Sequence, residues 1–145
     1  MTLSQQHRLA SVILPAGAGQ LMFYRVNGHE ALGRLFEYDV ELLSTSNDVD
    51  LKALLGKSAG IKLELEGGGS RFFNGIVTRA SFLGMLGEFY HYRVMLHPKL
   101  WLLSKASNCR VMSQPAKAKT VPEMIKDVLS EHGYDDVSLS LSESY

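Results

Sequence analysis

The sequence predicts a mainly β fold (β-rich α+β): a small, mostly antiparallel β-barrel with one short and one longer helix. Several stretches alternate apolar and polar residues with a period of two, which is typical of strands that bury one face. Turn residues separate these stretches. An open sheet would leave unpaired backbone groups along its edges, so closure into a barrel is favoured. The 145 residues, 46% of them hydrophobic, are enough for one core.

The first two predicted strands cover residues 8–14 and 20–26, joined by the flexible stretch PAGAG. Asn27 and Gly28 follow, and this dipeptide adopts positive φ at little cost. We therefore predict a turn there, before the next strand.

The third strand, residues 33–44, shows the alternation most clearly. Side chains at every second position of a strand share one face. The apolar face is predicted to line the core and holds Phe36, Tyr38, Val40 and Leu42. The opposite face is acidic and holds Glu37, Asp39 and Glu41.

Two hairpins are predicted next. Residues 61–66 alternate apolar with charged side chains, and three glycines at 67–69 turn the chain into the strand of residues 71–82. GMLG at 84–87 is the predicted tip of the second hairpin, which returns as residues 88–97. On that return strand Tyr90, Tyr92, Val94 and Leu96 share one face, and the opposite face holds Phe89, His91, Arg93, Met95 and His97.

Two helices interrupt the strands. Asp50 caps a short turn that Gly56 ends. The longer helix begins at Thr120, where T-x-x-E with Glu123 is a capping box, and Gly133 ends it. Its apolar residues fall at helical spacing and form one stripe that requires a docking surface: Val121, Met124, Ile125, Val128 and Leu129.

The remaining organisation follows from these elements. Residues 136–144, DVSLSLSES, are a possible strand. We predict a β-barrel hub domain over residues 1–110, with residues 111–145 holding the helix and the start of a following segment. The sequence reads as the front part of a longer chain.

Composition argues against several classes of function. Fifteen basic and fifteen acidic side chains give no net charge, which disfavours nucleic acid as a partner. Acids gather at residues 30–50 and bases at residues 99–119, an asymmetry that suits either pairing between copies or two solvated faces. The apolar run before Pro15 is too short for a secretory signal or a membrane span. Cys109 is the single cysteine and forms no disulfide framework.

No catalytic, cofactor-binding or metal-binding residues emerge from the motifs. His91 and His97 lie six residues apart on one strand, about 20 Å in extended chain, which is too far for one metal ion. The glycine run at 67–69 lacks the lysine of a phosphate-binding loop. From the residues alone we therefore predict a binding or structural domain and not an enzyme.

The order of five motifs goes further. They are GHEALGRLFEYDVELLS, DLKALLGKSAGIKLEL, RFFNGIVTRASFLG, EFYHYRVMLHPKLWLLSKASNCRV and TVPEMIKDVLSEHGYDDVSLSLSESY. Together they resemble the N-terminal portion of VgrG, the spike protein of type VI secretion systems, which is similar to the baseplate hub of contractile phage tails. The resemblance runs from about Arg8 to the end.

The resemblance implies a structural role without catalysis or cofactor. It implies a homotrimer whose six barrels sit on the hexameric Hcp tube, with effector proteins carried by regions outside these residues. It also implies assembly in the bacterial cytoplasm and export through the type VI apparatus without a cleaved signal peptide. Under this reading Glu37, Asp39 and Glu41 are candidate interface residues. Two alternatives are the hub of a phage or phage-derived contractile tail, and a free-standing enzyme or ligand-binding barrel.

Overall fold

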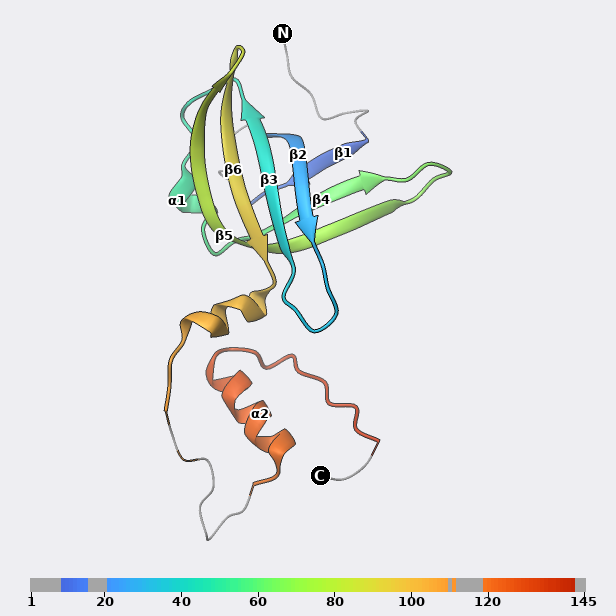
Figure 1. The fold of residues 1–145 in the computed structure, drawn as a ribbon, viewed down its shortest axis with the longest axis vertical. Helices are drawn as coiled ribbons and strands as arrows, with labels where there is room; N and C mark the ends of the chain where they lie inside the picture. Colours follow the sequence, from blue (N-terminus) through green and yellow to red (C-terminus); the bar gives the residue numbers. More distant parts are fainter. Residues whose placement is uncertain (1–8, 16–20, 110, 112–118, 143–145) are drawn as a thin grey trace. The chain divides into compact units, whose positions relative to one another are not determined.

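The computed structural model describes residues 9–15, 21–109, 111 and 119–142. They fall into two compact units, Met1–Trp101 and Leu102–Tyr145. The first unit holds all six strands and the second holds the longer helix (Figure 1). Within the described ranges, no helix is both long and apolar enough to cross a membrane.

The first unit is a half-barrel made from one antiparallel sheet with the strand order β1-β4-β5-β6-β3-β2. This confirms the predicted mainly β, antiparallel fold. The strands β1 and β2 stand at the two ends of this order and lie near each other. The six strands are β1 (Ala10–Ile13), β2 (Met22–His29), β3 (Glu37–Ser44), β4 (Ser58–Glu64), β5 (Ser70–Leu86) and β6 (Phe89–His97).

The core lies on the concave face of this sheet, where the predicted apolar row of β3 points. Tyr38, Val40 and Leu42 are buried, and Phe36 packs against them from just before the strand. Each fully buried aliphatic side chain contributes about 1.5–3 kcal/mol relative to exposure. Beside the β3 row, the core includes Val12, Leu21, Leu54, Ala59, Ile61, Val77, Tyr92, Val94 and Leu96.

Helix α1 (Leu51–Leu54) closes part of this core. The Asp50 carboxylate caps it, accepting hydrogen bonds from the amides of Lys52 and Ala53. Leu54 points inward and is fully buried. Backbone hydrogen bonds between Gly56 and Val77, and between Val77 and Lys57, tie the end of the helix to β5. The predicted short helix is therefore present and anchored.

Strand β5 changes its partner along its length. Its first residues, Ser70–Ile76, pair with β4, and its later residues, Ile76–Leu86, pair with β6. Because of this change the paired ends of β4 and β5 project from the rest of the sheet (Figure 1).

Two predicted turns lie elsewhere. Asn27 and Gly28 pair with Asp39 and Tyr38 inside β2, so the turn comes later, around Gly33. A Cβ on Gly28 would approach the Tyr38 ring to 2.9 Å, so the glycine admits that ring and does not make a turn. The predicted GMLG tip is also wrong, because Gly84 still pairs with β6 and the turn lies at Gly87–Glu88.

The second unit holds most of a 3-10 helix, η1 (Lys99–Lys105), which the sequence did not predict, and all of α2 (Val121–Glu131). The Glu123 carboxylate accepts hydrogen bonds from the amide and hydroxyl of Thr120, in agreement with the predicted helix start. The chain leaves α2 through Gly133, whose φ is +75°. The apolar stripe of α2 lines a groove of about 240 Å³, and none of its side chains is buried.

Residues 135–142 follow α2 without regular secondary structure. The sequence predicted a possible strand over residues 136–144, and the described part of that range pairs with no other strand. The apolar side chains Leu139 and Leu141 are 45% and 51% exposed. A segment with a period-two pattern forms a hydrogen-bonded ladder only against a neighbouring strand, and none of the described strands pairs with these residues.

Candidate functional site

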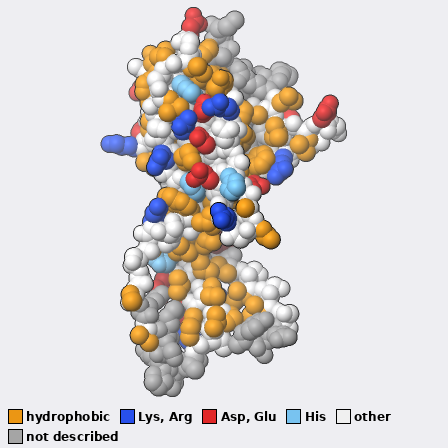
Figure 2. Space-filling model, in the orientation of Figure 1, with side chains coloured by type: hydrophobic (Ala, Val, Ile, Leu, Met, Phe, Trp, Pro, Cys, Tyr) orange, Lys and Arg blue, Asp and Glu red, His pale blue; other side chains and the backbone are white. Residues whose placement is uncertain are grey.

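The three acidic residues of β3 lie together on the convex face of the half-barrel. β3 is a central strand, with β2 on one side and β6 on the other. The acids therefore face cationic and histidine side chains from both neighbours. Figure 2 shows acidic, basic and histidine side chains mixed over β3 and β6.

Glu41 is the centre of this convex cluster. It pairs with Arg25 of β2 at 2.5 Å, with His91 of β6 at 2.9 Å and with Arg93 of β6 at 3.3 Å. These partners cover it so fully that Glu41 is only 3% exposed. Burial acts to raise the pKa of the carboxyl, but the hydrogen bonds from Arg25, His91 and Arg93 outweigh it and lower the pKa.

Glu37 belongs to a second chain of contacts at the other end of β3. Its carboxylate lies 2.9 Å from Nε2 of His97, and Nδ1 of that ring lies 2.7 Å from the Thr78 hydroxyl on β5. Trp101 packs near the His97 ring, with 4.8 Å between ring centroids. His97 is buried, whereas the Glu37 side chain is 54% exposed. Of the three acids, Glu37 is the most open to solvent.

Asp39 lies between these two groups and is less well satisfied. Its Oδ1 is 3.3 Å from Nε of Arg93, close enough for an ion pair. Both atoms are nevertheless buried without a hydrogen bond, so the two charges meet in poor alignment. The pair is an attraction between charges and not a directed bond.

The structure thus brings the three predicted interface residues onto one face, but it gives each a partner within the chain. Sequence reasoning placed His91, Arg93 and His97 on one face of their strand without linking that face to the acids. It missed Arg25 and Thr78 as partners. The missing information was the register, which sets Glu41 opposite both Arg93 and Arg25.

A second polar group joins the start of β5 to the segment after β2. The Tyr38 hydroxyl donates a hydrogen bond to Glu30, and Arg71 of β5 lies 3.7 Å from the same carboxylate. Arg71 also covers the Phe73 ring at 4.6 Å, and that ring meets Tyr38 edge to face. Burial and the hydrogen bond to Glu30 raise the pKa of Tyr38 to about 12.

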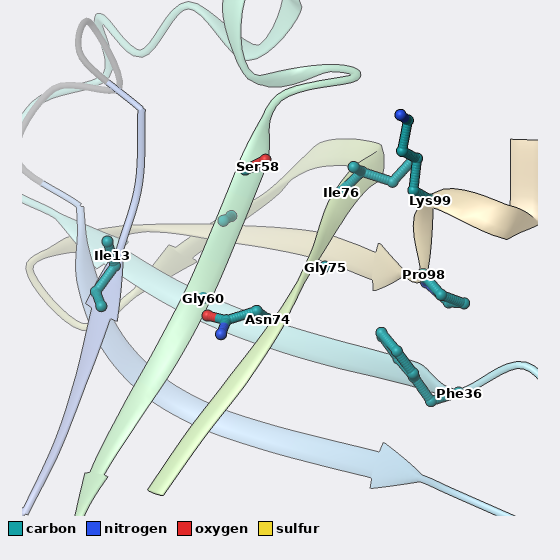
Figure 3. Close-up of a pocket in the computed structure, with 10 residues that line it drawn as sticks. Ile13, Phe36, Ser58, Gly60, Asn74, Gly75, Ile76, Pro98 and Lys99 are labelled. Carbon is teal, nitrogen blue, oxygen red and sulfur yellow. The ribbon is translucent and has the colours of Figure 1, made fainter. Parts of the chain in front are cut away.

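An open cleft of about 480 Å³ lies beside this group (Figure 3). β4 and β5 form one wall, with Asn74, Gly75 and Ile76 along β5. Phe36 and Pro98 lie across from β5 in Figure 3. The lining is mainly apolar, and the Thr78–His97–Glu37 chain does not line it. Across the described residues, no three histidine, cysteine or acidic side chains gather as metal ligands.

Comparison with known proteins gives this fold a family. The family model described as phage tail baseplate hub (GPD) matches residues 29–145. The chain belongs to this family. Membership of this structural family supports the prediction that the region is not an enzyme.

Among curated relatives, the type VI secretion system spike proteins VgrG1c and VgrG1b of Pseudomonas aeruginosa are each 43% identical over all 145 residues. VgrG1a of the same organism is 40% identical over 141 residues, 97% of this chain. The match covers 19% of VgrG1c and VgrG1b and 21% of VgrG1a, so the chain spans about a fifth of these relatives. The resemblance to VgrG predicted from the motif order is confirmed.

A solved structure shares the fold. The E. coli c3393 protein is described as a component of the type VI secretion system with structural similarity to the T4 bacteriophage tail proteins gp27 and gp5. It superposes with a TM-score of 0.59 at 21% identity, over 79% of this chain and 32% of that one. At this identity the likeness concerns the fold alone.

Proposed function

We propose that this chain is the N-terminal hub region of a type VI secretion spike, which trimerises and joins the puncturing tip to the hexameric Hcp tube. One observation carries the proposal: the 43% identity to two spike proteins extends over every described strand and helix of this chain. In such a trimer each chain must present complementary surfaces to its neighbours. Sheath contraction would drive the assembled spike out of the cytoplasm through the apparatus, with effectors bound by other regions.

The half-barrel suits a part that carries load. Its six strands are joined by antiparallel ladders, and ion pairs bridge β2, β3 and β6 on the convex face. Cross-strand charge pairs stabilise a hydrogen-bonded sheet. The domain division proposed from the sequence, with a hub over residues 1–110, fits a rigid base.

Within this proposal, the acidic row of β3 contributes unequally to the interface. Glu37 is the residue we assign to contact with a neighbour or the tube, because its side chain is the most exposed of the three. Glu41 belongs to the chain's own ion-pair cluster. Reversal of all three charges would therefore also break this ion-pair cluster and destabilise the fold.

A chimera tests the function. In VgrG1c the matching N-terminal region is replaced by residues 1–145, and secretion of Hcp is measured in a strain without other spike genes. We expect secretion comparable to that with VgrG1c itself, while a spike with this region deleted gives none. A stable, soluble chimera that exports no Hcp would refute the proposal. The chimera with Glu37→Lys should export less, and Glu64→Lys, an exposed acid on β4, is the matched control.

The second candidate is the hub of a phage or phage-derived contractile tail. It is favoured by the matching family model, which is named for phage tail baseplates. The same exchange in a contractile phage hub separates the two functions. Infectious particles from the phage chimera, together with no export from the VgrG1c chimera, would support the phage hub.

A further inference from the structure

The first residues of β5 have an unused backbone edge. Residues Ser70–Gly75 pair with β4 on one side, whereas pairing with β6 on the other side begins only at Ile76. No other described backbone group hydrogen-bonds to that second side. The open edge spans six residues, about 20 Å of extended chain. It holds no proline and no bulge, and its one charged side chain is Arg71.

The surroundings of this edge favour an apolar strand. Phe72 on the open edge is 52% exposed. The cleft described above runs past Asn74 and Gly75, with Phe36 and Pro98 facing the edge from across the gap (Figure 3). An added strand would pair with the backbone of β5 and place apolar side chains in this cleft.

The chain also contains a strand-like segment that pairs with none of the described strands. In residues 136–142 the apolar residues Val137, Leu139 and Leu141 alternate with serines, yet the segment joins no sheet. At seven residues it is about as long as the six-residue open edge, and it carries polar side chains on one face and apolar ones on the other. Asp136 at its start also offers a second acid to Arg71, which pairs with Glu30 at 3.7 Å and keeps a side chain that is 59% exposed.

We propose that residues 136–142 of a second copy of this chain pair with Ser70–Gly75 of β5. The contact is heterologous, because the edge of one copy takes the segment of the next, and the proposed trimer requires that successive copies are related by one third of a turn. This inference rests on the proposed trimeric spike and names the surfaces that hold its hub together.

Mixing two variants of the 145-residue chain tests the contact. The edge variant is Phe72→Lys with Asn74→Lys, and the segment variant is Leu139→Lys with Leu141→Lys. All four positions are exposed, so both variants should keep the circular dichroism spectrum of the wild type. We expect the wild type to reach the mass of three copies in light scattering, each variant to stay at one copy, and their equimolar mixture to form pairs. In the pair, one intact edge meets one intact segment.

Three results would overturn the inference. The first is a wild type that stays monomeric at every concentration. This outcome includes a monomer in which the amides of residues 70–75 are protected from hydrogen exchange, because the segment then pairs within its own chain. The second is trimers that persist in both variants. The third is a mixture that forms no pairs. None of these affects Hcp export by the VgrG1c chimera, so failure of the contact is distinguishable from failure of the proposed function. Hydrogen exchange slowed at residues 70–75 only in the trimer would support the contact directly.

Discussion

Removing the charge of Glu41 should destabilise the half-barrel. The Glu41→Gln substitution keeps the shape of the side chain but leaves Arg25, His91 and Arg93 without their shared carboxylate. Loss of one partner from a buried ion pair costs about 3–5 kcal/mol. Here the Arg25 and Arg93 side chains are 58% and 38% exposed and regain water, so we expect a loss nearer about 2 kcal/mol. In a domain of this size that lowers the Tm by about 6–8 °C.

The stabilisation by Glu41 should be lost in acid. The pKa of the Glu41 carboxyl is lowered in the folded chain, so its stabilisation is full above the ordinary glutamate pKa of about 4.3 and is lost as pH falls through the folded value. Urea unfolding followed by circular dichroism measures the free energy of unfolding of the wild type and of Glu41→Gln at pH 7 and at pH 3. The wild type should lose more stability than Glu41→Gln between these pH values, so the two curves converge in acid.

A matched control separates the cluster from ordinary surface charge. Glu64 of β4 pairs with Lys62 at 2.6 Å, but both side chains are exposed. Glu64→Gln should therefore leave the urea midpoint nearly unchanged. If Glu41→Gln is no more destabilising at pH 7 than this control, the convex cluster does not hold β2, β3 and β6 together and the reasoning fails.

Two further predictions concern the interior. Tyr38→Phe removes the hydrogen bond to Glu30 and should cost about 1 kcal/mol in urea unfolding. Because the pKa of Tyr38 is raised to about 12, wild-type stability should fall as pH rises above about 10, and an ultraviolet titration of Tyr38→Phe should lack the late-ionising tyrosine. Leu54→Ala should cost about 2–5 kcal/mol, since α1 buries this side chain completely. Leu55→Ala, at a largely exposed neighbour, should change the midpoint little; equal effects would mean that α1 does not close the core.

Local chemistry predicted those elements whose signals are complete within a few residues. The carboxylate of Asp50 caps α1, and Thr120 with Glu123 starts α2, because both ends of each capping contact lie within one helical turn. The alternation in β3 likewise assigned Tyr38, Val40 and Leu42 to the core, since a strand must place alternate side chains on opposite faces.

The errors occurred where a distant residue overrides a local preference. Asn27 and Gly28 favour a turn in isolation, but pairing with β3 keeps them extended and the Tyr38 ring occupies the space that a side chain at Gly28 would fill. In the same way, pairing with β6 carries β5 through Gly84 and moves the turn to Gly87. These contacts join residues too far apart in the chain for local propensity to register them.

The sequence by itself determined a β-rich chain with an acidic face on β3 and, through the order of its motifs, membership of the baseplate hub family. Only the tertiary structure decided what those acids do. The register of β3 between β2 and β6 turns Glu41 into the buried centre of an ion-pair cluster and leaves Glu37 open to solvent. A strand's alternation fixes which face a side chain takes, whereas its partners depend on how the strands align, and that alignment is set by the whole core.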